Sequence, residues 1–173
     1  MANPIAGVMM YLLLPERSYG WSISFLAETM GKIVQEAQAF LITMKEELPA
    51  QADNMFTVYV VNGEPAGVVL PHIEPDTDRE GRMFWVGMHP RYRGKGLGKS
   101  LHLTGLYRLQ NEYNAKTYLG STQIDNVPMR KIMAGNGCIE QHTLISLNYA
   151  PGEDGLLEEC KGMGERSTSG MIP

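Results

Sequence analysis

The segment spanning residues 83–109 constrains the fold of this 173-residue chain more than any other part of its sequence. Residues 83–88 form an apolar run, MFWVGM, with the length and composition of a buried strand. Residues 97–109 place leucines at the spacing of a helix. Between the two, the turn at 94–98 reads GKGLG and is rich in glycine. The segment therefore predicts a buried strand, a tight turn and a helix in direct succession.

The glycine-rich turn predicts a binding site for a phosphate group. Backbone N–H groups at the start of a helix lack partners within the helix and carry partial positive charge. Arg93, Lys95 and Lys99 add full positive charges at the same place, in a chain whose formal net charge is −4. The turn and its basic side chains are therefore expected to hold a phosphorylated cofactor. A glycine-rich turn with a solvated basic face is the alternative interpretation.

Two other phosphate-binding motifs do not fit this turn. A P-loop, G-x-x-x-x-G-K-[ST], would need a glycine at position 93 ahead of the sequence GKS at 98–100, and Arg93 stands there. The dinucleotide fingerprint G-x-G-x-x-G differs in spacing from Gly94, Gly96 and Gly98. The pattern that fits is R-x-x-G-x-G, formed by Arg93, Gly96 and Gly98.

This segment resembles motif A of the GCN5-related N-acetyltransferases (GNAT superfamily), and Met88-His89-Pro90 before it is similar to that family's V-x-P strand end. In that family the loop amides bind the pyrophosphate of acetyl-coenzyme A (acetyl-CoA). The resemblance therefore implies acetyl-CoA as co-substrate. The cofactor-binding residues that it implies in this segment are Met88, His89, Arg93, Gly94, Lys95, Gly96, Leu97, Gly98 and Lys99.

A second match to the family lies further along the chain. The family carries an Asn after its fifth strand and a Gly-Phe pair eleven residues later, and Asn126 stands at this spacing from Gly137-Cys138. The Asn side chain both donates and accepts hydrogen bonds, which suits the amide-rich pantetheine arm of the cofactor. Asn126 ahead of Val127-Pro128 also predicts a helix N-cap with proline in the first turn. One residue can serve both purposes.

The rest of the chain predicts further helices and strands. Apolar residues recur at helical spacing over residues 26–48, with a break near Gly31 and an end at Pro49. Two β-branched runs are joined by a hairpin turn that includes Asn62-Gly63. The expected strands are 7–14, 55–61, 66–73, 83–88, 116–122 and 139–148.

The order of these elements indicates an α/β (α+β) fold, because antiparallel strands come first and strand-helix-strand-helix-strand follows. We expect a mixed, mostly antiparallel central sheet of six to seven strands flanked by about four helices, as in the GNAT-like acyl-CoA N-acyltransferase fold. Residues 1–150 are expected to form a single domain. Residues 151–173 lack periodicity and are expected to be an extension that is mobile or contacts a partner. The final strand or this extension offers a surface for a homodimer.

Composition and charge narrow the classes of function. The apolar fraction of 43% is typical of a globular protein, and the negative net charge argues against nucleic-acid binding. Cys138 and Cys160 form no C-x-x-C pair and no pattern with the four histidines, so we expect free thiols, no metal site and a cytoplasmic protein. Residues 1–14 lack a basic n-region, and no apolar run is long enough for a membrane span. Neither a signal peptide nor a membrane partner is expected.

The resemblance implies an acetyl-CoA-dependent N-acetyltransferase that moves the acetyl group directly from the thioester to a primary amine of a small molecule or protein. The amine has to lose a proton before it attacks, and the tetrahedral intermediate needs a hydrogen-bond donor. In the family that donor is a backbone N–H near the end of the fourth strand, which corresponds to Met88 in this chain. A bulge there would part the fourth and fifth strands and admit the pantetheine arm.

Glu80 is the leading candidate for the catalytic base. In a regular strand positions 80, 82, 84, 86 and 88 share one face, and Glu80 is the only carboxylate among them. The alternative is that Glu80 belongs to a solvated acidic loop, residues 74–80, which could also attract a cationic amine. Glu74 and His72 are the next candidates.

The general acid departs from the family pattern. Many relatives carry a tyrosine seven residues after the Asn, where this chain has Met133, which has no proton to donate. The thiolate then leaves unassisted, or Tyr92, Tyr113 or Tyr118 replaces the missing group. A third interpretation is a coenzyme A-binding regulatory or interaction module with little or no turnover. Cys138 is expected to be a small buried hydrophobe, with an acetyl-cysteine relay as the alternative.

Overall fold

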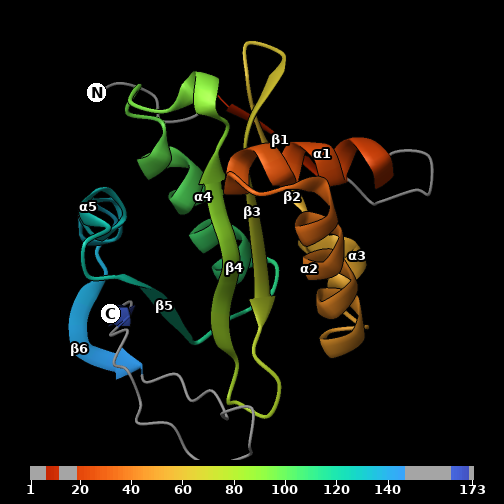
Figure 1. Ribbon diagram of the computed structural model, residues 1–173. Coiled ribbons are helices and arrows are strands. Elements are labelled where there is room, and N and C mark those ends of the chain that lie inside the picture. The colour runs from red at the N-terminus through yellow and green to blue at the C-terminus, as the bar shows by residue number, and fades with distance from the viewer. Residues whose placement is uncertain (1–6, 12–18, 147–164, 172–173) are drawn as a thin grey trace, which may run out of the picture. The chain divides into compact units, whose positions relative to one another are not determined.

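The computed structural model describes residues 7–11, 19–146 and 165–171 (Figure 1). The chain divides into two compact units, Met1–Tyr118 and Leu119–Pro173. Each unit is described by itself below.

Four antiparallel strands form the main sheet, which belongs to the first unit. They are neighbours in chain order: β1 (Gly7–Tyr11), β2 (Thr57–Val61), β3 (Glu64–Ile73) and β4 (Glu80–Met88). The chain turns from β2 to β3 at Asn62 and Gly63, whose φ angles of 52° and 81° are those of a two-residue type I′ turn. The predicted hairpin is therefore confirmed.

Helices cover both faces of the main sheet (Figure 1). Helices α1 (Tyr19–Met30) and α2 (Val34–Glu47) lie on one face, with the short α3 (Ala52–Met55) after them, and α4 (Gly98–Asn111) lies on the other face. The break near Gly31 is confirmed, because its φ of 65° lies in the left-handed region that ends α1. Helix α1 begins earlier than the sequence pattern predicted.

Each face of the sheet has its own apolar cluster. Leu26 of α1 and Leu41 of α2 pack with Leu70 of β3 on one face. On the opposite face Leu101 of α4 packs with Val69 of β3. Burial of these side chains on both faces of one strand explains why β3 is a continuous apolar run rather than an alternating one.

Strand β4 contains a bulge at Phe84 and Trp85, and not at Met88, where one was expected. Val86 pairs with Val69 and Met83 pairs with Pro71, so that Phe84 and Trp85 together oppose the single residue between these partners. Phe84 and Trp85 both pack against the cluster of α1 and α2, whereas Met83 and Val86 pack on the α4 side.

The bulge corrects the predicted alternation along β4. We expected positions 80, 82, 84, 86 and 88 to share one face, and this was wrong, because the extra residue reverses the alternation after Phe84. Met88 packs on the α4 side with Met83, and Phe84 faces the α1 and α2 side. The candidate residues Glu80 and Met88 therefore do not belong to one face.

The second unit holds a smaller antiparallel arrangement. Strand β5 (Thr117–Gln123) begins in the first unit, where Thr117 and Tyr118 pair in parallel with Glu80 and Gly81 of β4. From Leu119 on, β5 pairs with β7 (Glu165–Met171), and β7 pairs with β6 (Ile139–Ser146). Helix α5 (Val127–Gly135) connects β5 to β6.

The fold class is confirmed in part. The arrangement is a mixed α/β fold with five α-helices among the described residues, close to the expected four. The main sheet has four strands rather than the expected six to seven. The parallel pairing of β5 with β4 covers only two residue pairs. The pairings of β7 with β5 and β6 belong to the second unit. The sequence of β7, ERSTSGM, has no apolar alternation, so its strand was missed.

Several expectations fall on residues outside the described ranges. These are positions 12–14 of the first strand, positions 147–148 of the last strand, and residues 151–164 (with Cys160) and 172–173 of the expected extension. The division into a domain ending at residue 150 and an extension stays a prediction. Within the described ranges, no helix has the length and apolar character that a membrane crossing requires.

The core of the first unit contains His102, a histidine with no solvent exposure. His102 lies on α4, and its Nε2 is 3.2 Å from the hydroxyl oxygen of Tyr118. Burial lowers the pKa of His102 from 6.5 to about 4. The folded protein therefore holds this ring neutral in a range of pH where the unfolded chain protonates it.

We expect His102 to make the folded state less stable in acid. Because its folded pKa is lowered, its contribution is fully present above pH 6.5 and is lost as the pH falls from about 6.5 to about 4. The loss approaches about 2–3 kcal/mol at pH 4.5. Urea unfolding at pH 7.5 and pH 4.5 measures this loss of unfolding free energy. Glutamine does not titrate, so the loss between the two pH values should be smaller by about 2–3 kcal/mol in His102→Gln than in the unmodified protein. Equal acid sensitivity of the two proteins would contradict the prediction.

Candidate functional site

The predicted phosphate-binding loop lies between β4 and α4 on the surface of the first unit. Gly94 and Gly96 have φ angles of 73° and 75°, a region that side chains with a Cβ rarely adopt. A short 3-10 helix, η1 (Pro90–Tyr92), precedes them. Helix α4 follows, and Leu97 before it forms no side-chain cap. The start of α4 therefore offers backbone donors to a ligand rather than to a capping side chain.

The basic residues of this loop have different surroundings. Arg93 folds back, since its Nε donates to the carbonyl oxygen of Met88 at 3.0 Å and its guanidinium also donates to that of Thr29 at 3.0 Å. It thus ties the loop to the ends of β4 and α1, with further N–H donors left on the same group. The Lys95 ammonium lies over the ring of Tyr92, 5.0 Å from its centroid, and Lys99 is exposed.

His89 fixes the start of the loop from within the protein. Its Nδ1 accepts a hydrogen bond from the Arg91 amide at 3.2 Å, which caps η1. Its Nε2 pairs with the Glu28 carboxylate of α1 at 2.5 Å, and its ring stacks on Phe25. His89 was predicted at the cofactor. The role of α1 in holding His89 was not predicted, because Glu28 is 61 residues away in the chain.

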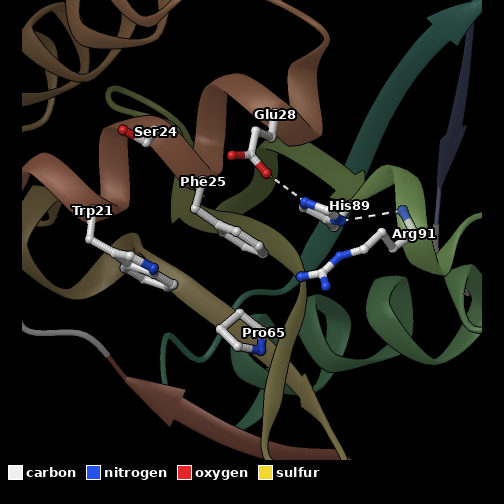
Figure 2. Close-up of a pocket in the computed structure, with 7 residues that line it drawn as sticks. All are labelled: Trp21, Ser24, Phe25, Glu28, Pro65, His89 and Arg91. Atoms are coloured by element: carbon white, nitrogen blue, oxygen red, sulfur yellow. Dashed lines mark hydrogen bonds and ion pairs between the residues drawn. The ribbon is translucent and has the colours of Figure 1, made fainter.

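A hollow of about 230 Å³ lies beside this histidine (Figure 2). Its walls come from α1, from the start of β3 and from the residues that follow β4. The lining residues are Trp21, Ser24, Phe25, Glu28, Pro65, His89 and Arg91. The hollow therefore borders the loop through His89 and Arg91.

Residues 9–136, well over half of the chain, match the family model of the Acetyltransferase (GNAT) family. The chain belongs to this family. Its members use acetyl-CoA, so the protein is an N-acetyltransferase with acetyl-CoA as the acetyl donor. The exposed loop with glycines at positive φ and an uncapped helix start is the part of the structure that fits the pyrophosphate. Among the described residues, no group of three or more potential ligands is suited to a metal ion.

Three similar proteins illustrate the relationship. An N-alpha-acetyltransferase of Saccharolobus solfataricus is 22% identical over 161 residues, which cover 83% of this chain and 96% of the relative. The structure of a spermidine N-acetyltransferase chimera from Vibrio cholerae has a TM-score of 0.68 at 12% identity, with 96% of this chain and 95% of the other covered. A chain of the NatC complex bound to Gag peptide and coenzyme A has a TM-score of 0.63 at 16% identity, with 95% and 98% covered.

Asn126 of the acetyltransferase lies in the second unit and caps α5. Its Oδ1 accepts from the Met129 amide at 3.2 Å, and its Nδ2 donates to the Thr122 hydroxyl at 3.0 Å. The predicted N-cap is confirmed. One amide hydrogen and one lone pair are not used in these two bonds, and the predicted contact with pantetheine stays a prediction.

The two predicted catalytic residues lie at opposite ends of β4. Glu80 is the first residue of the strand and Met88 the last, which places their backbones roughly 25 Å apart at about 3.3 Å per residue. The Oε1 of Glu80 accepts from Arg82 Nε at 2.8 Å and also lies 2.7 Å from a second guanidinium nitrogen. The structure therefore brings Met88 and the predicted phosphate-binding loop together and leaves Glu80 apart from them.

The tyrosines considered as general acids already have hydrogen-bond partners. The Tyr92 hydroxyl donates to Glu64 at 2.8 Å, and this bond raises the pKa of Tyr92. The Tyr113 hydroxyl donates to the Asn54 carbonyl at 3.3 Å, and burial raises the pKa of Tyr113.

Tyr118 and Cys138 are both buried. Tyr118 is 2% exposed beside His102 in the core of the first unit. In the second unit, burial raises the pKa of the Cys138 thiol, which keeps it protonated. This burial favours the interpretation of Cys138 as a small hydrophobe over an acetyl-cysteine relay.

Proposed function

We propose that this acetyltransferase transfers the acetyl group of acetyl-CoA directly to a primary amine, and that the α-amino group of a peptide or protein N-terminus is its preferred acceptor. The loop between η1 and α4 supports the binding of acetyl-CoA in this proposal, because it combines glycines at positive φ with an uncapped helix start. The relative from Saccharolobus solfataricus, an N-alpha-acetyltransferase aligned over 96% of its length, supports an α-amino group as the acceptor.

The ionisation of amines also favours an α-amino group. An α-amino group with a pKa of about 7.7–8.0 is partly neutral at physiological pH, whereas a lysine amine near 10.4 is almost fully protonated. Met133 stands where many relatives carry a tyrosine acid, so this chain has one proton-transferring group fewer than they do. An acceptor that loses its proton easily reduces the demand on the remaining groups.

The length of the donor places the reacting carbonyl away from Met88. An extended pantetheine arm of about 12 bonds spans roughly 15 Å, which is the rise of about four to five strand residues. A pyrophosphate on the loop after Met88 would then put the thioester near the bulge at Phe84 and Trp85. We infer that a backbone N–H at this bulge, rather than that of Met88, stabilises the tetrahedral intermediate, and that Met88 lies along the arm.

A small polyamine is the second candidate acceptor. The fold is similar to that of a spermidine N-acetyltransferase chimera. The acidic loop of this chain is, however, partly neutralised, because Asp78 pairs with Lys116 at 2.7 Å and Glu80 pairs with Arg82. The remaining charge is small for a ligand with several ammonium groups.

A panel of amines tests the proposal. Release of the coenzyme A thiol should be fastest with peptides that have a free N-terminus, and should fall to background when the same peptide is blocked at the α-amine but keeps a lysine. Faster turnover of spermidine or of lysine side chains would contradict the preferred acceptor. A protein that binds acetyl-CoA and acetylates no amine would contradict the proposed activity as a whole.

A further inference from the structure

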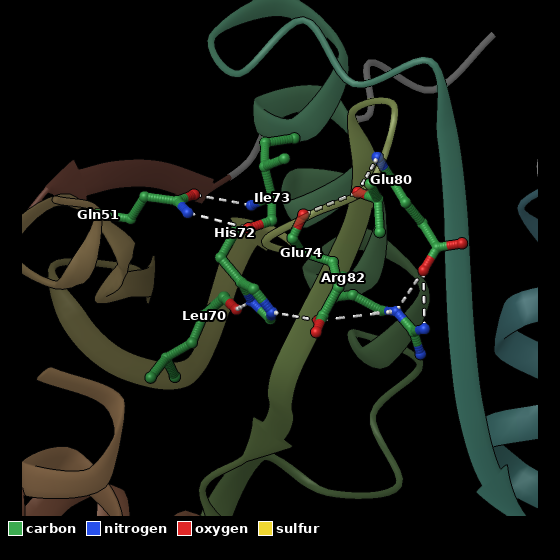
Figure 3. Close-up of polar contacts among 8 residues, drawn as sticks. Gln51, Leu70, His72, Ile73, Glu74, Glu80 and Arg82 are labelled. Atoms are coloured by element: carbon green, nitrogen blue, oxygen red, sulfur yellow. Dashed lines mark hydrogen bonds and ion pairs between the residues drawn. The ribbon is translucent and has the colours of Figure 1, made fainter. Parts of the chain in front are cut away.

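A buried histidine next to the β4 bulge has one ring nitrogen without a hydrogen-bond partner. His72 of β3 has no solvent exposure, and its ring stacks on Phe84 with centroids 4.0 Å apart and 14° between the planes. Its Nδ1 lies 3.5 Å from the carbonyl oxygen of Leu70. Its Nε2 forms no hydrogen bond within 3.5 Å, and its nearest polar contact is Glu74 Oε2 at 3.6 Å (Figure 3). An unsatisfied buried nitrogen costs about 1–3 kcal/mol, so its presence calls for an explanation.

We infer which ring nitrogen of His72 carries the proton from its two nearest acceptors, the Leu70 carbonyl oxygen at 3.5 Å from Nδ1 and Glu74 Oε2 at 3.6 Å from Nε2. A carbonyl oxygen can only accept, so an attractive contact with Leu70 requires the proton on Nδ1. Burial lowers the pKa of His72, and the ring is therefore neutral, with a lone pair on Nε2. Oε2 of Glu74 faces this lone pair at 3.6 Å. Two acceptors thus face each other, and a donor between them would satisfy both.

The charged neighbours leave Glu74 available for such a donor. Arg82 binds Glu80 at 2.7 Å, whereas the nearest approach of its Nε to Glu74 is 4.0 Å. Glu74 and Arg82 are the charged groups that act on His72 among the described residues. The Glu74 side chain is 38% exposed, so it connects the buried ring to solvent.

The backbone beside this pair is firmly held. The Gln51 side chain donates to the Ile73 carbonyl at 2.9 Å and accepts from the Ile73 amide at 2.7 Å (Figure 3). Ile73 separates the two residues of the pair, so these bonds fix the strand between them. Phe84, on which the ring stacks, is one of the two bulge residues at which the thioester was placed above.

We propose that His72 accepts the proton of the acceptor ammonium and that Glu74 positions this ammonium against it. The inference rests on the proposed function. The N–H bond of the ammonium breaks and its proton moves to Nε2 of His72, which releases it through Glu74 to solvent. The neutral nitrogen forms a bond to the acetyl carbonyl carbon, the carbon–sulfur bond breaks, and the departing thiolate takes up the second proton from the new amide nitrogen.

The first experiment observes the ring directly. Nitrogen-15 NMR of the full chain with labelled histidine should show His72 as the neutral Nδ1–H tautomer at pH 7. A proton on Nε2 would overturn the inference, because the ring would then have no lone pair facing Glu74. This measurement requires no turnover, so its outcome is independent of whether the proposed acetyltransferase activity is found.

The second experiment compares two buried histidines. His72→Gln should lower kcat about 100-fold or more, leave KM for acetyl-CoA unchanged, and remove the acidic limb of the pH–rate profile. His102→Gln, which also replaces a fully buried histidine, should keep that limb. If both variants lose activity equally with the limb retained, or if His72→Gln keeps the kcat of the unmodified protein, the inference is wrong.

Glu74→Gln provides a variant at a partly exposed position. Glu74 raises the pKa of His72, so its removal should move the acidic limb to lower pH and raise KM for the amine. An unchanged limb together with an unchanged KM would overturn the role of Glu74. Because this substitution keeps the size of an exposed side chain, it is expected to fold even where His72→Gln does not.

Discussion

Gly96→Glu lowers the affinity for acetyl-CoA by about 100-fold or more. Gly96 lies in the exposed loop before α4 with a φ of 75°, and no atom of the protein would contact an added Cβ. A carboxylate there stands where the pyrophosphate is expected to bind, and it adds repulsion between like charges to the steric block. A 100-fold loss corresponds to about 2.7 kcal/mol of binding free energy.

A second glycine in the same backbone conformation is the matched control. Gly63 has a φ of 81° at the β2–β3 turn, also with no atom near an added Cβ. Gly63→Glu should carry a similar strain of about 1–2 kcal/mol in folding stability and leave acetyl-CoA affinity unchanged. Titration calorimetry measures both variants. Equal affinity of Gly96→Glu and the unmodified protein would remove the loop from the donor site.

Arg108→Ala lowers the free energy of unfolding by about 3–5 kcal/mol. Arg108 lies on α4 with 3% exposure, and its guanidinium donates to the Thr57 hydroxyl at 2.5 Å and to Glu112 at 2.9 Å. Thr57 has no solvent exposure, so it would lose a donor that water cannot readily replace. The long Arg108 side chain also packs over the ring of Tyr113, and truncation removes that contact as well.

Urea unfolding measures the decrease in unfolding free energy of Arg108→Ala, and two further variants test its cause. Arg91→Ala, at an exposed arginine, should change stability by no more than about 0.5 kcal/mol. Arg108→Met combined with Glu112→Leu should recover part of the loss, because the apolar pair keeps the packing and leaves no charge behind. A stability of Arg108→Ala within about 1 kcal/mol of the unmodified protein would show that the buried contacts do not matter.

The features that were correctly predicted are local ones. The strand, glycine turn and helix over residues 83–109, the Asn62-Gly63 hairpin and the break at Gly31 all follow from periodicity and from backbone angles that glycine and asparagine adopt most easily. Each depends on residues within a few positions of one another. The N-cap at Asn126 belongs to the same class.

The features that were missed depend on contacts between distant residues. Arg93 reaches Thr29 over a separation of 64 residues, and His89 reaches Glu28 over 61. Met83, Phe84, Trp85 and Val86 are all apolar, so their sequence carries no alternation that would reveal where the bulge lies. A run without alternation was the available signal, and it was interpreted as a buried strand, with a bulge expected near Met88 instead.

The sequence by itself determined the family of this protein and the glycine-rich loop proposed to bind the donor, because the backbone geometry of such a loop is encoded in consecutive residues. Only the tertiary structure decided which residues face the reacting end of β4. One extra residue in that strand reverses every later side chain, and the register with β3 that places this residue is set by packing against helices far away in the chain. The proposal of His72 and Glu74 in place of Glu80 likewise depends on a tertiary contact, because Arg82 pairs with Glu80 at 2.7 Å and approaches Glu74 only to 4.0 Å.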